Sequence, residues 1–536
     1  MHPNLILLNA KIHTLDSSVG TASALAISGE RVVAVGSDAE ILALADSKAE
    51  KIDLKSRTVV PGLTDAHIHF EWYARLLKNV NAETPTLDGC LAQVATKAAA
   101  TPKGGWIVGH GWNHNVWGGE FPTATDLDRA APEHPVFLTA KSGHAGWTNS
   151  LALRLAGITA GTPDPPGGKI RRDKSGRPTG ILLEEATGLV GRHIPEPTAE
   201  DVARDMKPAM ENCWRAGLTG IHNFVMADET MRPFVAYQLL KERGELGLRV
   251  VMNIPVGLLD EAIALGLRTG FGDDWLRLGN VKIFADGALG PRTAAMIEPY
   301  EGEPDNKGMV VTDKEELYEH GSKAADHGLA LTVHAIGDKA NHDVLDVLES
   351  VPNPKFQIPN SKRLRHRIEH VQLLHAQDYR RLGKLGIIAS MQPIHATSDM
   401  LMADKFWGKR SVGAYAWRTQ LKAGAVLAFG SDAPVEPINP LYGVHAAVTR
   451  RRADGSPGPQ GWYPEQRLTV EEAVRGFTWG AAYAAGMEDR LGTLAPGRLA
   501  DLVVLDRDIF NCDPMGIREA EVVGTMVAGV WRFTAI

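Results

Sequence analysis

The sequence predicts an α/β fold: a (β/α)8 barrel that carries a small composite β-sandwich built from both ends of the chain. Apolar, β-branched runs alternate with helical patterns through the central region. Such alternation is typical of a parallel sheet, and the closed (β/α)8 barrel is its leading closed form. Both chain ends read as short strands that cannot bury a face alone. The 536 residues suffice for one large domain and an accessory domain.

The composition indicates a globular protein and argues against a nucleic-acid or membrane partner. The chain is 44% hydrophobic and 23% charged, with a formal net charge of −7, which is ordinary for a globular protein. The short run Arg450-Arg451-Arg452 is more typical of a solvated loop than of a nucleic-acid surface. No apolar run reaches the roughly 18 residues of a membrane-spanning helix. We therefore expect a small-molecule substrate and no nucleic-acid or membrane partner. The oligomeric state stays open, with a homodimer as one alternative.

The cysteines and the N-terminus indicate a cellular location. Cys90, Cys213 and Cys512 are far apart and odd in number, so we expect no disulfide framework, as in a reducing compartment. The first residues lack a positive segment followed by a long apolar one, so no signal peptide is expected. The sequence thus predicts a cytoplasmic protein.

The first 62 residues read as a small β unit. Residues 4–8, 24–28, 31–35 and 58–60 are apolar or β-branched and predict strands. Gly29-Glu30 lies between two of them and indicates a hairpin turn. Residues 39–45 read as a short helix.

Residues 491–536 have the same character. Residues 492–505 give a turn followed by a strand, and 521–534 give one or two more around Gly529. We expect segments 1–62 and 491–536 to pair into one sandwich, which leaves 63–490 as an inserted central domain.

The central region supplies the predicted barrel. Its helical patterns include 314–327 and 340–350, and a segment of about 71–135 that is rich in Gly, Pro and Trp reads as an insertion over the barrel mouth. In such barrels functional residues lie where strands end, at the C-terminal face. The candidate strands are 136–140, 220–224, 249–254, 281–284, 329–334, 366–371, 387–392 and 426–430.

His67 and His69 follow an apolar run and a Pro-Gly break. In a strand, alternate side chains point to the same face, so the two imidazoles project together and can bind one metal ion. A His-x-His pair alone also occurs as two polar residues near a turn, and the other strand ends decide between these interpretations.

Lys282 and His334 lie at two further predicted strand ends. A lysine inside an apolar strand either extends to water or loses its charge. A neutral amine there can capture carbon dioxide and form a carbamate that bridges two metals. His334 directly follows a β-branched run and is either a metal ligand or a buried structural histidine.

His370 and Asp432 complete the series. His366 and His370 share a face in a strand as well as in a helix, and His370 is nearer the strand end, so we take it as the ligand. Glu369 then points away from that face, in an orienting or structural role. Asp432 follows an apolar strand and a Gly-Ser turn. It can cap the next helix, or bind a metal and act as a general base.

These His, Lys and Asp groups fall at successive strand ends, and with their flanking residues they resemble the amidohydrolase superfamily. The chain is similar nearly end to end to amidohydrolase family 3, the group that includes N-substituted formamide deformylases. The residues that carry the resemblance are 61–69, 143–150, 282–292, 334–338, 366–370, 430–434 and 496–503.

The resemblance implies a (β/α)8 barrel with a composite sandwich and a centre of one or two metal ions, usually Zn²⁺. His67 and His69 match ligands of the more buried ion, and Lys282 matches the position of a carboxylated bridging lysine. His334 and His370 match ligands of the second ion. Asp432 matches the last-strand aspartate, both ligand and general base.

The expected reaction is hydrolysis of a non-peptide C–N bond in an amide, formamide or cyclic amide by activated water. His144, in a Gly-rich loop, is the side-chain candidate to stabilise the oxyanion, or else holds its turn. Trp112 can pack on the substrate or within the insertion. Arg292 can bind a carboxylate or form a structural ion pair. An ester, lactone or carbamate hydrolase is the alternative, and a non-catalytic barrel is disfavoured because the ligand set is intact.

Overall fold

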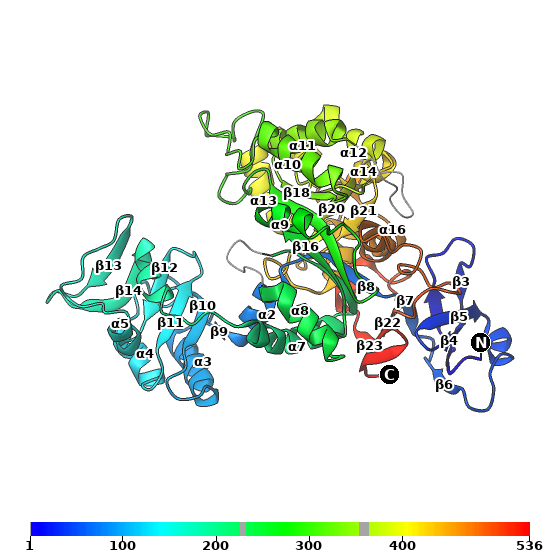
Figure 1. Ribbon diagram of the computed structural model, residues 1–536, viewed down its shortest axis with the longest axis horizontal. Coiled ribbons are helices and arrows are strands. Elements are labelled where there is room, and N and C mark those ends of the chain that lie inside the picture. Colours follow the sequence, from blue (N-terminus) through cyan, green and yellow to red (C-terminus); the bar gives the residue numbers. More distant parts are fainter. Residues whose placement is uncertain (1, 226–231, 353–363) are drawn as a thin grey trace. The chain divides into compact units, whose positions relative to one another are not determined.

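A computed structural model describes residues 2–225, 232–352 and 364–536. The chain forms two compact units, Met1–Glu71 with Met206–Ile536 and Trp72–Asp205. The first unit holds the barrel and both chain ends (Figure 1). Among the described residues, none of the helices has both the length and the apolar character needed to span a bilayer.

The barrel is a sheet of eight parallel strands, which confirms the predicted fold class. Each strand pairs in parallel with the next along the chain. Several are buried along their whole length, as expected where helices cover the outside of a sheet and side chains fill the inside. The strands are β8 (Leu63–Ile68), β15 (Leu218–Asn223), β16 (Arg249–Pro255), β17 (Leu276–Phe284), β18 (Leu331–Ala335), β19 (Arg367–His370), β20 (Ile388–Met391) and β21 (Leu427–Phe429).

The segment after β21 returns to β8 and closes the circle. Ile68 and Ala433 form a parallel bridge, the Asp432 N–H donates to His67 O at 2.8 Å, and the His69 N–H donates to Ala433 O at 2.9 Å. Gly430 permits this approach, because a Cβ there would lie 2.4 Å from the His67 nitrogen. Closure therefore fixes the backbone of the His-x-His motif.

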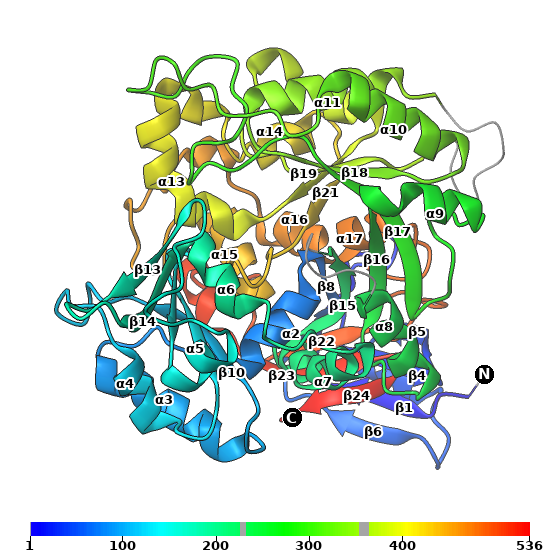
Figure 2. The same cartoon turned by 60° about the vertical axis from the view of Figure 1, so that its left-hand side comes forward.

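Helices cover the barrel and lead away from its strands. Figure 2 shows α10 (Lys314–Asp326) and α11 (Asp338–Ser350) outside β18, as the sequence predicts. The Asp313 side chain caps α10 by accepting the Glu316 N–H at 2.9 Å. Two helices follow the last strands: α13 (Pro393–Trp407) comes after β20, and α15 (Pro440–Thr449) comes after β21. Further helices include α8 (Arg232–Glu242), α9 (Leu259–Ala264), α12 (Arg381–Leu385), α14 (Trp417–Lys422) and α17 (Ala481–Ala484).

Both chain ends build one pair of sheets (Figure 2). Strand β7 (Thr58–Pro61), from the N-terminal end, pairs antiparallel with β22 (Leu502–Leu505), from the C-terminal end. Apolar side chains of both segments share one core, for example Ile12, Leu25 and Leu502. One sheet has the order β5-β4-β1-β6 and the other β24-β23-β22-β7-β2-β3, with β1 (Leu5–Leu8), β2 (Lys11–His13), β3 (Thr21–Ala22), β4 (Ala24–Ser28), β5 (Arg31–Gly36), β6 (Glu50–Asp53), β23 (Val522–Val527) and β24 (Val530–Thr534).

The second unit is a six-stranded sheet with helices packed against it. It extends beyond the predicted insertion of about 71–135, because the strands after that segment continue the same sheet. The sequence predicts 136–140 as a barrel strand, and this assignment is wrong: these residues form β11 of this unit. Its elements are β9 (Val80–Asn81), α3 (Leu87–Ala100), β10 (Ile107–Trp112), α4 (Ala124–Ala130), β11 (Val136–Ala140), β12 (Ala145–Thr148), α5 (Ser150–Leu155), β13 (Gly168–Arg172) and β14 (Pro178–Glu184).

Candidate metal centre

Six predicted site residues lie at or just beyond the C-terminal ends of barrel strands. His67 and His69 end β8 or follow it, His334 and His370 lie in the last residues of β18 and β19, and Asp432 follows β21. Their rings are close, with centroids 4.9 Å apart for His67 and His370 and 4.6 Å apart for His334 and His370. The sixth residue, Lys282, lies two residues before the end of β17.

A carboxylate oxygen lies between two of the imidazoles. Asp432 Oδ1 is 3.4 Å from His67 Nε2 and 3.2 Å from His69 Nε2. His67, His370 and Asp432 each offer a ligand atom, and these atoms lie within 4.8 Å of one another. All three residues are buried.

The other nitrogen of each ring is held by an acceptor. His67 Nδ1 is 2.6 Å from Glu369 Oε2, and His69 Nδ1 is 3.0 Å from the Phe224 carbonyl oxygen. His370 Nδ1 is 2.8 Å from Gln392 Oε1. Since carboxylate, carbonyl and amide oxygens only accept, each Nδ1 carries the proton and each Nε2 of a neutral ring presents a lone pair. Metal-binding histidines in proteins are oriented in the same way.

Burial keeps the rings of His67, His334 and His370 neutral. It lowers the pKa of His67 to about 4, against the opposing charges of Glu369 and Asp432. It also lowers the pKa of His334 to about 3 and holds that of His370 well below its usual range. A metal requires an unprotonated imidazole, so these rings are ready to bind at neutral pH without losing a proton.

This arrangement fits a cation. Unless the ring takes a second proton, the Nε2 lone pair of His67 faces the acceptor oxygen of Asp432 with no hydrogen between them. Two buried acceptors that face each other in this way are costly. A divalent ion satisfies both, and neutral imidazole with carboxylate is a common zinc donor set.

Lys282 lies beside this centre in an aromatic environment. Its Nζ is 4.9 Å from the ring centre of Phe224 and 4.5 Å from that of Phe284, and the residue is 4% exposed. Burial lowers the pKa of the ammonium to about 8, although Glu369 and Asp432 act in the opposite direction. A substantial share of the side chain is therefore a neutral amine slightly above neutral pH.

Glu369 does not turn away from the centre. It bonds His67, pairs with Arg367 Nε at 2.5 Å and accepts from Thr332 Oγ1 at 2.5 Å. Burial would raise the pKa of this carboxyl, but Arg367 and His67 outweigh burial and keep it well below its usual range. Glu369 thus orients His67 as an anion.

Two buried aspartates that the sequence does not single out accept backbone hydrogen bonds at the strand ends. Asp65 accepts the backbone N–H groups of His67 and Ser431, both at 3.0 Å. Asp286 accepts three backbone N–H groups and lies 3.6 Å from His334 Nε2. Burial raises the pKa of each to about 7. Asp65 lies two residues before His67. Because alternate residues of a strand share a face, this spacing is the sequence signal that could have identified Asp65 as a site residue.

The backbone is strained at the ligand positions. His370 has φ of 74°, Val371 has 45° and Asp432 has 63°. The left-handed region costs about 1–2 kcal/mol for residues other than glycine. Such conformations cluster at functional sites, where the surrounding structure imposes them.

Arg292 forms a structural ion pair, the second of the two roles that the sequence allows for it. Its Nε lies 2.8 Å from Glu303 Oε1, and both side chains are about one-third exposed. Its guanidinium also lies over the Phe406 ring, 5.0 Å from the centroid. The structure therefore gives it a local structural partner.

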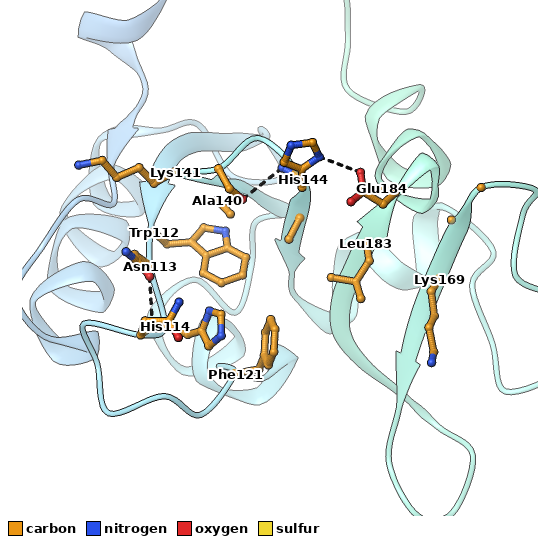
Figure 3. A pocket seen from close by; sticks show the side chains of 15 residues that line it. Trp112, Asn113, His114, Phe121, Ala140, Lys141, His144, Lys169, Leu183 and Glu184 are labelled. Carbon is orange, nitrogen blue, oxygen red and sulfur yellow. Dashed lines mark hydrogen bonds and ion pairs between the residues drawn. The ribbon is translucent and has the colours of Figure 1, made fainter. Parts of the chain in front are cut away.

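Trp112 and His144 lie in the second unit and line a cavity of about 790 Å³ there (Figure 3). Trp112 is 1% exposed and donates from Nε1 to Leu138 O at 2.8 Å. The exposed His144 pairs through Nδ1 with Glu184 Oε2 at 2.9 Å. Their predicted roles toward the substrate stay predictions.

His395 is a further buried residue near the centre that the sequence does not single out. It lies near the start of α13, and its Nε2 is 3.7 Å from Asp432 Oδ2. A search for polar residues one turn beyond each strand, instead of at its end, would have found it.

Comparisons with known proteins agree with this geometry. A model of the amidohydrolase family matches residues 50–533. Protein LONG AFTER FAR-RED 3 of Arabidopsis thaliana is 34% identical over 537 residues, 98% of this chain and 91% of that protein. N-substituted formamide deformylase of Arthrobacter pascens is 31% identical over 549 residues, 99% of this chain and 98% of that protein.

A solved structure shares the fold over almost the whole chain. It is an uncharacterized metal-dependent hydrolase from Pyrococcus furiosus, with a TM-score of 0.78, 30% identity and coverage of 95% of this chain and 100% of that chain. The family match spans nearly the full sequence and includes every barrel strand. The chain belongs to the amidohydrolase family.

Proposed function

We propose that this protein hydrolyses a non-peptide C–N bond in a small amide, formamide or cyclic amide. The observation that carries the proposal is the set of Nε2 lone pairs of His67, His69 and His370 around the Asp432 carboxylate. The similarity to N-substituted formamide deformylase of Arthrobacter pascens supports a formamide as the first substrate to try.

These residues would hold one or two divalent ions, with Zn²⁺ as the proposed metal. Such an ion makes water nucleophilic at neutral pH and polarises a carbonyl group. His67, His69 and Asp432 would hold the more buried ion, and His334 and His370 the other. Glu369, Gln392 and the Phe224 carbonyl keep the ring lone pairs turned inward.

Asp432 is the proposed general base. A carboxyl group that binds a cation does so as the carboxylate, and in that form Asp432 can accept the proton of the attacking water. It then returns that proton to the leaving nitrogen, which must be protonated to depart.

Elemental analysis and a substrate panel test the proposal together. Protein purified without chelators is expected to contain at least one zinc per chain and to hydrolyse an N-substituted formamide or a small cyclic amide. Chelation should abolish turnover and zinc should restore it. Turnover of esters, lactones or carbamates alone would replace the C–N assignment, and full activity of metal-free protein would refute the metal centre.

We further propose that Lys282 is carboxylated and in that form would bridge two ions when they are bound. A Lys282→Ala variant should lose most of its bound metal, and small carboxylates such as formate or acetate should restore part of it. The exposed Lys384 is 74% accessible at its side chain, so Lys384→Ala is the matched control. Full metal content in Lys282→Ala, with no effect of added carboxylate, would reject the bridge.

A further inference from the structure

His395 is a buried histidine beside the centre that none of the roles above uses. It lies in the first turn of α13, directly after β20, and is 7% exposed. Its ring is nearly parallel to that of His370, with centroids 6.1 Å apart and planes inclined by 18°. Its Nε2 points toward Asp432, 3.7 Å from Oδ2.

The tautomer of His395 follows from its neighbour Gln372. Gln372 Nε2 lies 3.4 Å from His395 Nδ1. An amide nitrogen only donates, so Nδ1 accepts and the ring proton sits on Nε2. His395 therefore directs an N–H group at the space in front of Asp432.

That N–H group has no hydrogen-bond partner among the residues that the structure describes. The 3.7 Å separation from Asp432 is too long for a hydrogen bond. Buried donors are normally satisfied, so an open N–H group beside the centre can receive a ligand atom. The positive end of the α13 dipole lies at the same place and favours negative charge there.

We propose that His395 donates its Nε2–H to the carbonyl oxygen of the bond that is cleaved. This inference rests on the proposed function and names a barrel side chain that stabilises its oxyanion, a role that the sequence predicts for His144. Water attacks the carbonyl carbon, the C=O π electrons move onto oxygen, and Asp432 takes the water proton. The hydrogen bond from His395 strengthens as that charge develops, which is how a preorganised donor accelerates acyl transfer.

Two substitutions separate hydrogen bonding from packing. His395→Phe keeps a ring of similar size without the donor, and His395→Gln keeps an N–H donor without the imidazole. We expect kcat of the phenylalanine variant to fall about 100- to 1000-fold, the usual effect of losing an oxyanion donor. KM should change less than about threefold, because the contact forms mainly in the transition state. The glutamine variant should recover at least about tenfold in kcat.

Three measurements besides turnover accompany this comparison. Metal per chain and the thermal midpoint of both variants should equal those of the wild type, and His320→Phe on the outer face of α10 is the matched control. The inhibition constant of a phosphonamidate with the substrate's N-substituent should rise in His395→Phe by about the same factor as kcat falls. Loss of metal from that variant, or unchanged affinity for the phosphonamidate, would overturn the proposal.

A test on metal-free protein needs no substrate. In ¹⁵N-histidine-labelled protein, the signal absent from His395→Phe should show a protonated Nε2 and an unprotonated Nδ1. Gln372→Leu removes the donor to Nδ1 and should populate the other tautomer. A wild-type His395 protonated on Nδ1 would overturn the proposal whatever the substrate. If only esters are cleaved, the C–N assignment fails, and the same His395 variants are compared on the ester.

Discussion

At the scale of single residues, Asp432 combines a left-handed backbone with contacts to several histidines. Its backbone adopts φ of 63°, its N–H is bonded to His67 O, and its carboxylate faces three histidines. One short turn after β21 thus serves both to close the barrel and to bring an anion to the His-x-His motif. The strain is held by the bonds on either side of it.

Asp432→Asn tests the base without removing an oxygen ligand. An amide cannot take a proton from water, so kcat should fall by about 100- to 10,000-fold, the range for loss of general base catalysis. Because a carbonyl oxygen remains, most of the bound metal should stay. The measurements are turnover and elemental analysis, with Asp454→Asn in an exposed loop as control. Near wild-type turnover in Asp432→Asn would remove Asp432 from this role.

The sequence predicts the convergence of His67, His334, His370 and Asp432 because the end of each strand can be recognised locally from an apolar run and its break. His395 is missed because it lies inside a helix, where its pattern is that of an ordinary first turn. The orienting role of Glu369 is among the predicted ones, but its direction is predicted wrongly, because strict alternation turns it away from His370. The left-handed backbone at His370 ends that alternation, and no local pattern reveals it.

At the scale of elements, β19 shows how one short strand supports the site. Arg367 and Glu369 point into the barrel and bond each other, while His370 ends the strand at the centre. Just before the strand, His366 Nδ1 accepts the Leu331 N–H at 3.0 Å, which joins β19 to the start of β18. That hydrogen bond requires an imidazole without a proton on Nδ1.

Acid should weaken this link. Burial lowers the pKa of His366 to about 4, whereas an unfolded histidine titrates near 6.5. Between these values the unfolded chain binds the extra proton, so stability is lost as pH falls from about 6.5 toward 4 and not further below. The full effect is about 3 kcal/mol for this group. His366→Asn should flatten the decline of the thermal midpoint over this range, and an unchanged slope would contradict the assignment.

Strand positions follow from sequence more readily than strand partners. Residues 136–140 form a strand as predicted but belong to the sheet of the second unit. A short apolar run has the same local pattern in either sheet, and membership is decided by pairing with β10 and β12. The partners of a strand cannot be predicted from a five-residue segment, because the pairing is nonlocal.

At the scale of the whole molecule, a buried ion pair joins the sandwich to the barrel. Arg249 begins β16, and Asp501 directly precedes β22. Arg249 Nε and Nη2 lie 2.5 Å and 2.8 Å from the two oxygens of Asp501, which also accepts the Ala528 N–H at 2.9 Å. Because Arg249 lies at the N-terminal end of its strand, the pair is at the barrel face opposite the metal centre, where residues serve stability.

Breaking this pair should destabilise the protein and leave the site intact. Asp501→Ala strands a buried guanidinium, and removing one partner of such a pair costs about 3–5 kcal/mol. Replacing both, as in Arg249→Met with Asp501→Ala, leaves no uncompensated charge and should cost less than Asp501→Ala alone. The thermal midpoints of the wild type, Arg249→Met, Asp501→Ala and the double variant measure this coupling. Metal content and turnover at low temperature should equal the wild type in all of them. A double variant no more stable than Asp501→Ala would show that the pair does not act as a unit, and that the chain ends are held to the barrel by their apolar core alone.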